Sequence, residues 1–149
     1  MRHRSLLVAG AAAATAALTA FAPSASAGTP SPIPGMYQYQ NVGTGKCLET
    51  DGNSVYPQDC NSTSYNQRWV ATGTSSVQLR NAATNKCLGI KGPSVLPQDC
   101  GSGHQNWMLN GANPYQLTNI ATGKCVGTDG SSVYVQDCTG GDDQNWKRM

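Results

Sequence analysis

The sequence is poor in the residues on which most enzymes depend. It has two histidines and one phenylalanine among 149 residues, and charged side chains make up 12% of the chain. General acid–base and nucleophilic catalysis most often use a histidine beside a second reactive group. His3 lies in the N-terminal leader described below, so His104 is the one histidine left for such a role. No catalytic motif surrounds it, so we expect a protein that is not an enzyme.

Long apolar runs are also absent, except at the N-terminus. Two arginines precede an apolar stretch over residues 6–22, and an A-x-A cleavage signal ends at Ala27, so residues 1–27 are predicted to be a signal peptide. The stretch is shorter than the roughly 20 residues that span a bilayer. We therefore expect a secreted, extracellular protein without membrane insertion, in which a Pro-rich lead over residues 28–36 precedes the folded domain.

Neither sign of charge predominates once the leader is removed. The full chain has ten Lys and Arg against eight Asp and Glu, and two arginines lie in the leader, which leaves eight of each. Domains that bind nucleic acid usually carry a basic patch or stripe. The balanced charge therefore argues against a nucleic-acid partner.

Cysteine, in contrast, is plentiful, and its spacing is regular. The six cysteines form three pairs whose members are thirteen residues apart, namely Cys47 and Cys60, Cys87 and Cys100, and Cys125 and Cys138. An even number of cysteines in an exported chain is typical of a disulfide framework, and six allow fifteen pairings. One bridge within each pair is the simplest pairing that the repeated spacing offers. The pairs lack the close C-x2-4-C spacing of zinc sites, so we expect no metal and no cofactor.

The cysteine pairs mark three copies of one block. The copies share Lys-Cys, Ser-Val, Gln-Asp-Cys and a Gln-x-Trp ending, and they are "GKCLETDGNSVYPQDCNSTSYNQRW" at 45–69, "NKCLGIKGPSVLPQDCGSGHQNW" at 85–107 and "GKCVGTDGSSVYVQDCTGGDDQNW" at 123–146. With their upstream segments they form repeats of about 40 residues, at about 37–73, 77–111 and 115–149, within one domain over residues 37–149. A repeat of this length buries a core only together with its neighbours.

Each repeat has the pattern of four short strands and no helical period. The segments "YQYQNV", "VQLRNA" and "YQLTNI" alternate with period two, a second strand holds the first cysteine, a third leads to the second cysteine, and a fourth follows Gln-x-Trp. Gly52 and Gly130, each after an aspartate, supply positive φ for the turn between the second and third strands. Pro57 and Pro97 have no N–H to donate, so the third strand is expected at a sheet edge or a bulge.

Three in-register Gln-x-Trp units in repeats of this length resemble the ricin B-type β-trefoil lectins. The units that carry the match are Gln67-Arg68-Trp69, Gln105-Asn106-Trp107 and Gln144-Asn145-Trp146. Within that family the repeats most resemble those of actinohivin-like actinomycete lectins. These share the Val-Tyr of the third strand, which is found here at 55–56 and 133–134. The resemblance implies an all-β fold, a β-trefoil of three four-stranded repeats.

The Gln-x-Trp units are expected to be scaffold. A tryptophan is a large apolar body and a glutamine a short polar group that bonds to backbone when buried. The resemblance implies the same roles. The predicted structural core is Trp69, Trp107, Trp146, Gln105 and Gln144.

The resemblance also implies where a sugar would bind. A sugar offers hydroxyls and one apolar face, so its site needs an aromatic ring and a hydrogen-bonding acid or amide, and a charged acceptor makes the stronger bond. In the family an acid lies two residues after the first cysteine. Actinohivin-like repeats add the third-strand tyrosine, an asparagine after the second cysteine and an aromatic residue before Gln-x-Trp. The first repeat matches best, with the carbohydrate-binding candidates Glu49, Tyr56, Asn61, Tyr65, Asn66 and Gln67.

The other two repeats match less well. The third keeps Tyr134, with Gly127 in place of the acid and Thr139 and Asp143 at the remaining positions. Asp129 offers a substitute acid but is better explained as a turn residue. The second repeat has Gly89, Leu96 and Gly101 in place of the acid, the tyrosine and the asparagine, and His104 at the position before Gln-x-Trp. We therefore expect no working site in the second repeat.

The Gln-Asp pair before the second cysteine recurs even in the degenerate second repeat, which favours a structural role. We expect Asp59, Asp99 and Asp137 to accept hydrogen bonds from backbone N–H groups of their loops.

These observations predict a secreted, monomeric, non-catalytic lectin whose partners are mannose- or galactose-type glycans on cell surfaces or polysaccharides. The resemblance to actinohivin-like lectins implies mannose-type glycans. The alternative is a β-trefoil with vestigial sugar sites that binds protein, for example as a protease inhibitor. A glycosidase needs a pair of carboxyl groups at the scissile bond, whereas the carboxylates here are few and lie mostly in turns.

Overall fold

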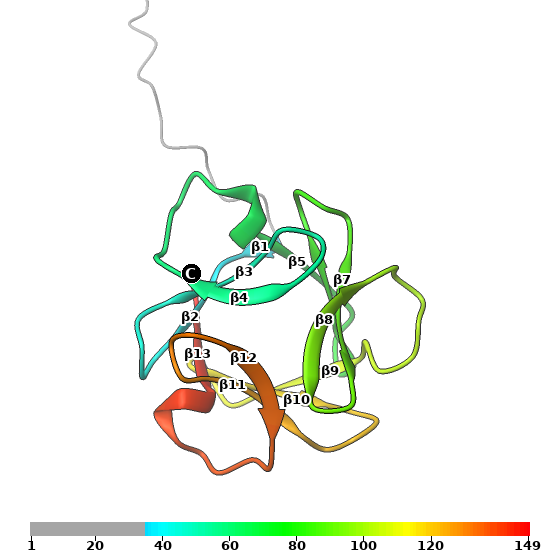
Figure 1. Ribbon diagram of the computed structural model, residues 1–149. Helices are drawn as coiled ribbons and strands as arrows, with labels where there is room; N and C mark the ends of the chain where they lie inside the picture. Colours follow the sequence, from blue (N-terminus) through cyan, green and yellow to red (C-terminus); the bar gives the residue numbers. More distant parts are fainter. Residues whose placement is uncertain (1–34) are drawn as a thin grey trace, which may run out of the picture. The chain divides into compact units, whose positions relative to one another are not determined.

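The computed structural model describes residues 35–149 (Figure 1). The predicted signal peptide and all but the end of the Pro-rich lead lie outside these residues. The described residues form thirteen β-strands and two short 3-10 turns. The prediction of an all-β fold is therefore confirmed. No helix among them is long and apolar enough to cross a membrane.

The thirteen strands divide into three groups of four, because the first strand of the first repeat is interrupted at Gln38. The first group consists of β1 (Met36–Tyr37) and β2 (Tyr39–Asn41), then β3 (Cys47–Thr50), β4 (Val55–Gln58) and β5 (Trp69–Thr72). The second consists of β6 (Gln78–Asn81), β7 (Cys87–Lys91), β8 (Ser94–Gln98) and β9 (Trp107–Asn110). The third consists of β10 (Tyr115–Asn119), β11 (Cys125–Thr128), β12 (Val133–Gln136) and β13 (Asn145–Arg148).

The first and last strands of the three groups pair in a closed ring. β1 pairs with β5, β5 with β6, β9 with β10, β10 with β13, and β13 with β2. A bridge between Val77 and Trp107 joins the start of β6 to β9. Because β1 and β2 are two halves of one strand, the ring closes on itself, which leaves no long unpaired edge in the barrel.

The remaining strands form three hairpins, β3–β4, β7–β8 and β11–β12. Figure 1 shows β4, β8 and β12 arranged about a common centre. Pro57 lies on β4, which ends the sheet, and Pro97 lies on β8, whose bridge to β12 is at Ser94 instead. Pro57 thus lies on an edge strand, as predicted. β8 is not an edge strand, but its one bridge to β12 is at Ser94, so Pro97 has a ladder partner on the β7 side only.

The hairpin turns use glycine in the left-handed region. Gly52 has φ of 92° and Gly130 has φ of 91°. A residue with a Cβ is strained at such angles, whereas glycine is not. The predicted positive φ at these turns is confirmed.

Three tryptophans fill the centre of the molecule. Trp69, Trp107 and Trp146 each have 0% of their surface exposed. Their indole nitrogens donate to equivalent second-strand carbonyls, those of Leu48 at 3.0 Å, Leu88 at 2.8 Å and Val126 at 3.0 Å. Burying one such side chain stabilises the fold by roughly 4–6 kcal/mol on area grounds.

All three predicted disulfides are present. They join Cys47 to Cys60, Cys87 to Cys100, and Cys125 to Cys138. Each bridge closes a loop of thirteen residues, which contributes about 3 kcal/mol in the chain-entropy account. A chain that has few Leu and Ile for its core thus obtains part of its stability from cross-links.

The prediction for the aspartates before the second cysteines was wrong. Their carboxylates do not accept backbone N–H groups but pair with lysines, Asp59 with Lys46 at 2.6 Å, and in the same way Asp99 with Lys86 and Asp137 with Lys124. Each lysine and each aspartate directly precedes one cysteine of a bridge, so the bridge brings them side by side. The aspartate side chains are about 86% exposed, and exposed pairs contribute at most about 1 kcal/mol.

Candidate functional site

The β3–β4 hairpin brings two predicted residues of the first repeat together. Glu49 and Tyr56 are directly opposite each other in the ladder, so their side chains lie on the same face. The Tyr56 hydroxyl donates a hydrogen bond to Oε1 of Glu49 at 3.1 Å. Both side chains are half-buried. An acid and an aromatic ring therefore share one position on the surface, as a sugar site requires.

Gln67 makes a hydrogen bond to the acid of this pair. It ends the 3-10 turn η1 (Tyr65–Gln67) and is 1% exposed. Its Nε2 donates to Oε2 of Glu49 at 2.7 Å and to the carbonyl of Asp59 at 2.8 Å. Its Oε1 accepts the backbone N–H of Asn61 at 2.8 Å. Gln67 thus joins the hairpin to the loop after the second cysteine.

The other predicted residues of the first repeat differ in accessibility. Asn61 is exposed, and its Oδ1 accepts bonds from the N–H and the hydroxyl of Thr63 at 3.0 and 2.7 Å. Its side-chain N–H groups have no partner within residues 35–149. Tyr65 is 56% exposed. Asn66 instead donates to the carbonyl of Thr50 at 2.7 Å, which anchors η1 to β3.

The charge at Glu49 and Tyr56 favours ligand groups that donate hydrogen bonds. Burial, and then the hydrogen bond to Glu49 and the charges of Glu49 and Asp51, raise the pKa of Tyr56, so the phenol stays protonated at neutral pH. The ion pairs among the described residues use other carboxylates, and no cation there pairs with Glu49. A carboxylate has about four lone-pair positions, and protein donors take two of those on Glu49. The other positions have no protein donor within residues 35–149.

The third repeat obtains its acid from a different element. Tyr134 is opposite Gly127, and its ring lies 3.1 Å from where a Cβ on Gly127 would be. Asp143, in the 3-10 turn η2 (Asp142–Gln144), accepts a bond from Nε2 of Gln136 at 3.0 Å. Burial, then the charges of Asp143 and Asp129, raise the pKa of Tyr134. The second strand thus has no acid opposite this tyrosine, and the carboxylates whose charge acts on it are Asp143 of the loop and Asp129 of the turn.

The remaining residues of the third repeat have structural bonds. Oδ1 of Asp129 accepts the backbone N–H groups of Ser131 and Ser132, both at 2.8 Å, which confirms its role as a turn residue. These bonds lower the pKa of Asp129. Thr139 is exposed and donates its N–H to Oε1 of Gln144 at 2.8 Å, as Asn61 does to Gln67.

In the second repeat, a side chain of the protein itself occupies the position that corresponds to Glu49 of the first repeat. Oε1 of Gln98 lies 2.4 Å from where a Cβ on Gly89 would be, so it occupies the place that Glu49 takes in the first repeat. Gln105 donates to that oxygen at 3.3 Å and to the carbonyl of Asp99 at 2.7 Å. Leu96 lies opposite Gly89. This position has neither an acid nor an aromatic ring.

Sequence reasoning missed a set of buried asparagines that hold the site loops. Asn41, Asn81 and Asn119 are all 0% exposed. Each donates its side-chain N–H to the carbonyl just before Gln-x-Trp of the preceding repeat, and the three bonds are Asn41 to Asp143 at 2.8 Å, Asn81 to Asn66 at 2.8 Å and Asn119 to His104 at 2.9 Å. The signal was a polar residue that recurs at one place in all three first strands.

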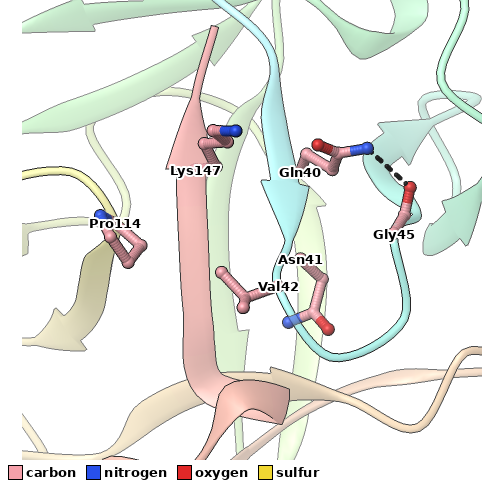
Figure 2. Close-up of a pocket in the computed structure, with 6 residues that line it drawn as sticks. All are labelled: Gln40, Asn41, Val42, Gly45, Pro114 and Lys147. Atoms are coloured by element: carbon pink, nitrogen blue, oxygen red, sulfur yellow. Dashed lines mark hydrogen bonds between the residues drawn. The ribbon is translucent and has the colours of Figure 1, made fainter.

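A separate pocket of about 350 Å³ lies against the paired strands β13 and β2 (Figure 2). Its lining residues are Gln40, Asn41, Val42, Gly45, Pro114 and Lys147. Gln40 donates to the carbonyl of Gly45 at 3.0 Å across its rim. The lining contains no carboxylate and no aromatic ring, so its chemistry differs from that of the first-repeat site. No group of three metal-ligating side chains is present within residues 35–149.

Comparisons with known proteins identify the family of this fold. The family model described as ricin-type beta-trefoil lectin domain-like matches residues 24–98, and the model described as ricin-type beta-trefoil lectin domain matches residues 75–148. No curated protein matches the chain. The two family matches overlap and together extend over all three repeats.

Solved structures show the same fold. The designed threefold-symmetric protein ThreeFoil matches with a TM-score of 0.68 at 25% identity, over 77% of this chain and 98% of its own. A ricin B-like lectin of Macrolepiota procera, in complex with lactose, matches with a TM-score of 0.66 at 20% identity, over 76% and 93%. A GlcNAcα1-4Gal-releasing endo-β-galactosidase of Clostridium perfringens matches with a TM-score of 0.67 at 16% identity, over 76% of this chain and 32% of the enzyme. This chain thus spans about a third of that enzyme, and the predicted β-trefoil is confirmed.

Proposed function

Because the chain belongs to the ricin-type β-trefoil lectin domain family, we propose that it is a non-catalytic lectin for neutral hexose glycans, with the first repeat as its main site. The observation that carries this proposal is the Glu49 carboxylate, which is bonded to the Tyr56 hydroxyl and has lone pairs that no donor among the described residues uses. Such a pair offers strong acceptors for sugar hydroxyls and a flat face for the apolar side of the ring.

The first repeat presents donors and acceptors together. Glu49 accepts ligand hydroxyls, and the exposed side-chain amide of Asn61 donates. The hydroxyl hydrogen of Tyr56 is directed at Glu49, so its oxygen is an acceptor for the ligand. Two neighbouring hydroxyls of a hexose both donate and accept, and this combination suits them.

The charge of the site selects against acidic sugars. Glu49 and Asp51 lie near Tyr56, and among the described residues neither takes part in an ion pair. A carboxylated or sulfated sugar would bring like charge into the site at a cost in affinity. Neutral glycans of the mannose or galactose type are therefore the proposed ligands.

The choice between these two types has support on both sides. The resemblance to actinohivin-like lectins favours mannose. The lactose complex of the Macrolepiota procera lectin and the galactose-containing substrate named for the Clostridium perfringens enzyme favour galactose. In both relatives the matched part has the fold of this chain. We propose no catalytic step for this chain.

The third repeat is proposed as a second, weaker site. Tyr134 and Asp143 provide the ring and the acid there, and Thr139 replaces the asparagine. Two sites on one chain raise the apparent affinity for a dense glycan surface by roughly 10²–10⁴ over that for free sugar. We place the mature, monomeric protein outside the cell, where its three disulfides persist.

The test is a glycan array probed with the mature protein, the Glu49→Gln variant and the Asp51→Asn variant. Both substitutions remove one negative charge, but an asparagine at 51 can still form the turn bonds that Asp51 makes with Asn53 and Ser54. We expect binding to neutral glycans that falls about tenfold in Glu49→Gln and is unchanged in Asp51→Asn.

Two results would contradict this expectation. Binding that survives Glu49→Gln at full strength would place the main site elsewhere, with Tyr134 the next candidate. The absence of binding to every glycan would refute the lectin function and leave the protein-binding β-trefoil as the alternative.

A further inference from the structure

A buried glutamine reaches the first-repeat site from the barrel. Gln38 lies at the break between β1 and β2 and is 4% exposed. Its backbone N–H and carbonyl both bond to Met149, at 3.1 and 3.0 Å. Its side-chain Nε2 donates to Oε1 of Gln67 at 2.8 Å and to the carbonyl of Asn61 at 2.8 Å. A side chain from the first strand therefore contacts both loop residues that support the site.

Gln38 completes the hydrogen bonding of Gln67. A glutamine side chain has two donor hydrogens and two acceptor lone pairs. The Gln67 oxygen accepts from Gln38 and from the Asn61 N–H, and its nitrogen donates to Glu49 and to the Asp59 carbonyl. All four capacities are filled by protein groups, so Gln67 has none left for a ligand. Its part in the site is to hold Glu49.

The same bonds allow only one orientation of the Gln67 amide. A flipped amide would direct its nitrogen at the Gln38 and Asn61 donors and its oxygen at the Glu49 carboxylate. Four favourable contacts would become four repulsive ones. Because the Gln38 amide faces two acceptors, its own orientation is set as well.

The other repeats lack this arrangement. The equivalent first-strand glutamines, Gln78 and Gln116, are half-buried within continuous strands. Within residues 35–149, Oε1 of Gln105 and Oε1 of Gln144 each accept one bond, from the N–H of the residue after the second cysteine. The break in the first strand distinguishes the repeat that has the best site.

We propose that Gln38 is a positioning residue of the first-repeat site, which acts through Gln67 to hold the Glu49 carboxylate in place for the sugar. A chain of buried hydrogen bonds pre-organises an acceptor, and pre-organisation raises affinity because less ordering is left for the binding step. The inference rests on the proposed lectin function, and it predicts that the first repeat binds more tightly than the third.

The test compares Gln38→Met with Gln116→Met in the mature, ¹⁵N-labelled protein. Methionine retains the volume and length of glutamine and removes the amide. Methyl α-mannopyranoside and methyl β-galactopyranoside are titrated while backbone amide shifts report each repeat separately. We expect Gln38→Met to weaken binding about tenfold at the first repeat and to leave the third unchanged, whereas Gln116→Met changes neither.

A double-mutant cycle separates positioning from general stability. If Gln38 acts through Glu49, Gln38→Met lowers affinity no further in a Glu49→Ala background. An additive effect, an equal loss at both repeats, or an affinity within twofold of the unchanged protein would overturn the inference. A failure of the unchanged protein to bind either glycoside or any arrayed glycan would overturn the lectin function and the inference together.

A measurement on the unchanged protein covers the case in which Gln38→Met does not fold. The side-chain NH2 of Gln67 donates both hydrogens within a buried network, so it should exchange with solvent at least tenfold more slowly than that of Gln144. Equal exchange rates for the two side chains would contradict the proposal that Gln38 acts through Gln67.

Discussion

The side-chain amide of Asn41 donates a hydrogen bond to the carbonyl of Asp143 at 2.8 Å, across 102 residues of sequence. The bond ties the first strand of the first repeat to the loop of the last repeat. Equivalent bonds from Asn81 and Asn119 join the other neighbouring repeats. The loops that carry the candidate sugar-binding residues are therefore each held by the following repeat.

Replacing Asn41 with alanine should destabilise the protein by about 1–3 kcal/mol, because it leaves buried backbone groups without partners. Oδ1 of Asn41 also accepts the N–H of Thr44 at 3.0 Å, so the turn after β2 loses a bond as well. Urea unfolding measures the change. Asn53→Ala is the matched control, since Asn53 is exposed and bonds through its backbone N–H. A difference below about 0.5 kcal/mol between the two variants would show that the bond carries little stability.

Tyr39→Phe should leave stability unchanged or raise it by about 1 kcal/mol. Tyr39 is 0% exposed, and its hydroxyl makes no hydrogen bond of ordinary geometry within residues 35–149, although the Arg148 side chain lies near it. The equivalent residues Leu79 and Leu117 are apolar and equally buried. Thermal and urea unfolding report the change, with the half-buried Tyr37→Phe as a control that should stay within about 0.5 kcal/mol. A clear loss of stability in Tyr39→Phe would mean that the hydroxyl is bonded in solution.

Stability should fall in alkaline solution. Burial raises the pKa of Tyr39 from 10.0 to about 12, partly offset by the charge of Arg148. Above pH 10 the unfolded chain loses this proton while the folded state retains it, so the unfolded state binds fewer protons and the free energy of unfolding decreases with pH. The full shift corresponds to roughly 2–3 kcal/mol. Urea unfolding at intervals from pH 8 to 11 should show the decrease, and Tyr39→Phe should make it smaller, with a remainder from Tyr56 and Tyr134, whose pKa values are also raised. An unchanged slope in that variant would assign the effect to other groups.

The second repeat should accept a designed site. Gly89→Glu with Leu96→Tyr recreates the cross-strand pair of Glu49 and Tyr56. The new side chain must displace the flexible end of Gln98, and the exposed Gln58 of the first repeat shows that this glutamine can face solvent.

We expect the double variant to show sugar-dependent shifts in the second repeat, measured by NMR with the glycoside that the first repeat binds. Leu96→Tyr alone supplies the ring without the acid and should show none. A structure of the double variant in which Gln98 still occupies the space beside residue 89 would contradict the design.

Much of the fold could be predicted because it depends on local rules applied three times. The cysteine spacing in the three copies was enough to pair all six cysteines. Glycine after aspartate marked the hairpin turns, and Gln-x-Trp marked the buried tryptophans. The lysine partners of Asp59 and its equivalents were missed, because the two residues become neighbours only when the disulfide forms.

The candidate site could be predicted by position but not by arrangement. Glu49 and Tyr56 meet because the hairpin register places them opposite each other, and that register follows from the turn. The burial of Gln67 and its place between Glu49 and Asn61 depend on η1, which the sequence did not indicate.

The sequence by itself determined the class of the molecule, namely a disulfide-linked β-trefoil of three similar units, since repeated local patterns favour the same local structure wherever they occur. Only the tertiary structure decided how the equivalent positions of the three units differ. Gln98 occupies the space beside Gly89 in the second repeat, Asp143 bonds to Gln136 in the third, and Gln38 bonds to Gln67 in the first. These outcomes depend on which side chains from separate strands and loops reach the same space, and on which of their hydrogen-bonding groups remain unpaired there.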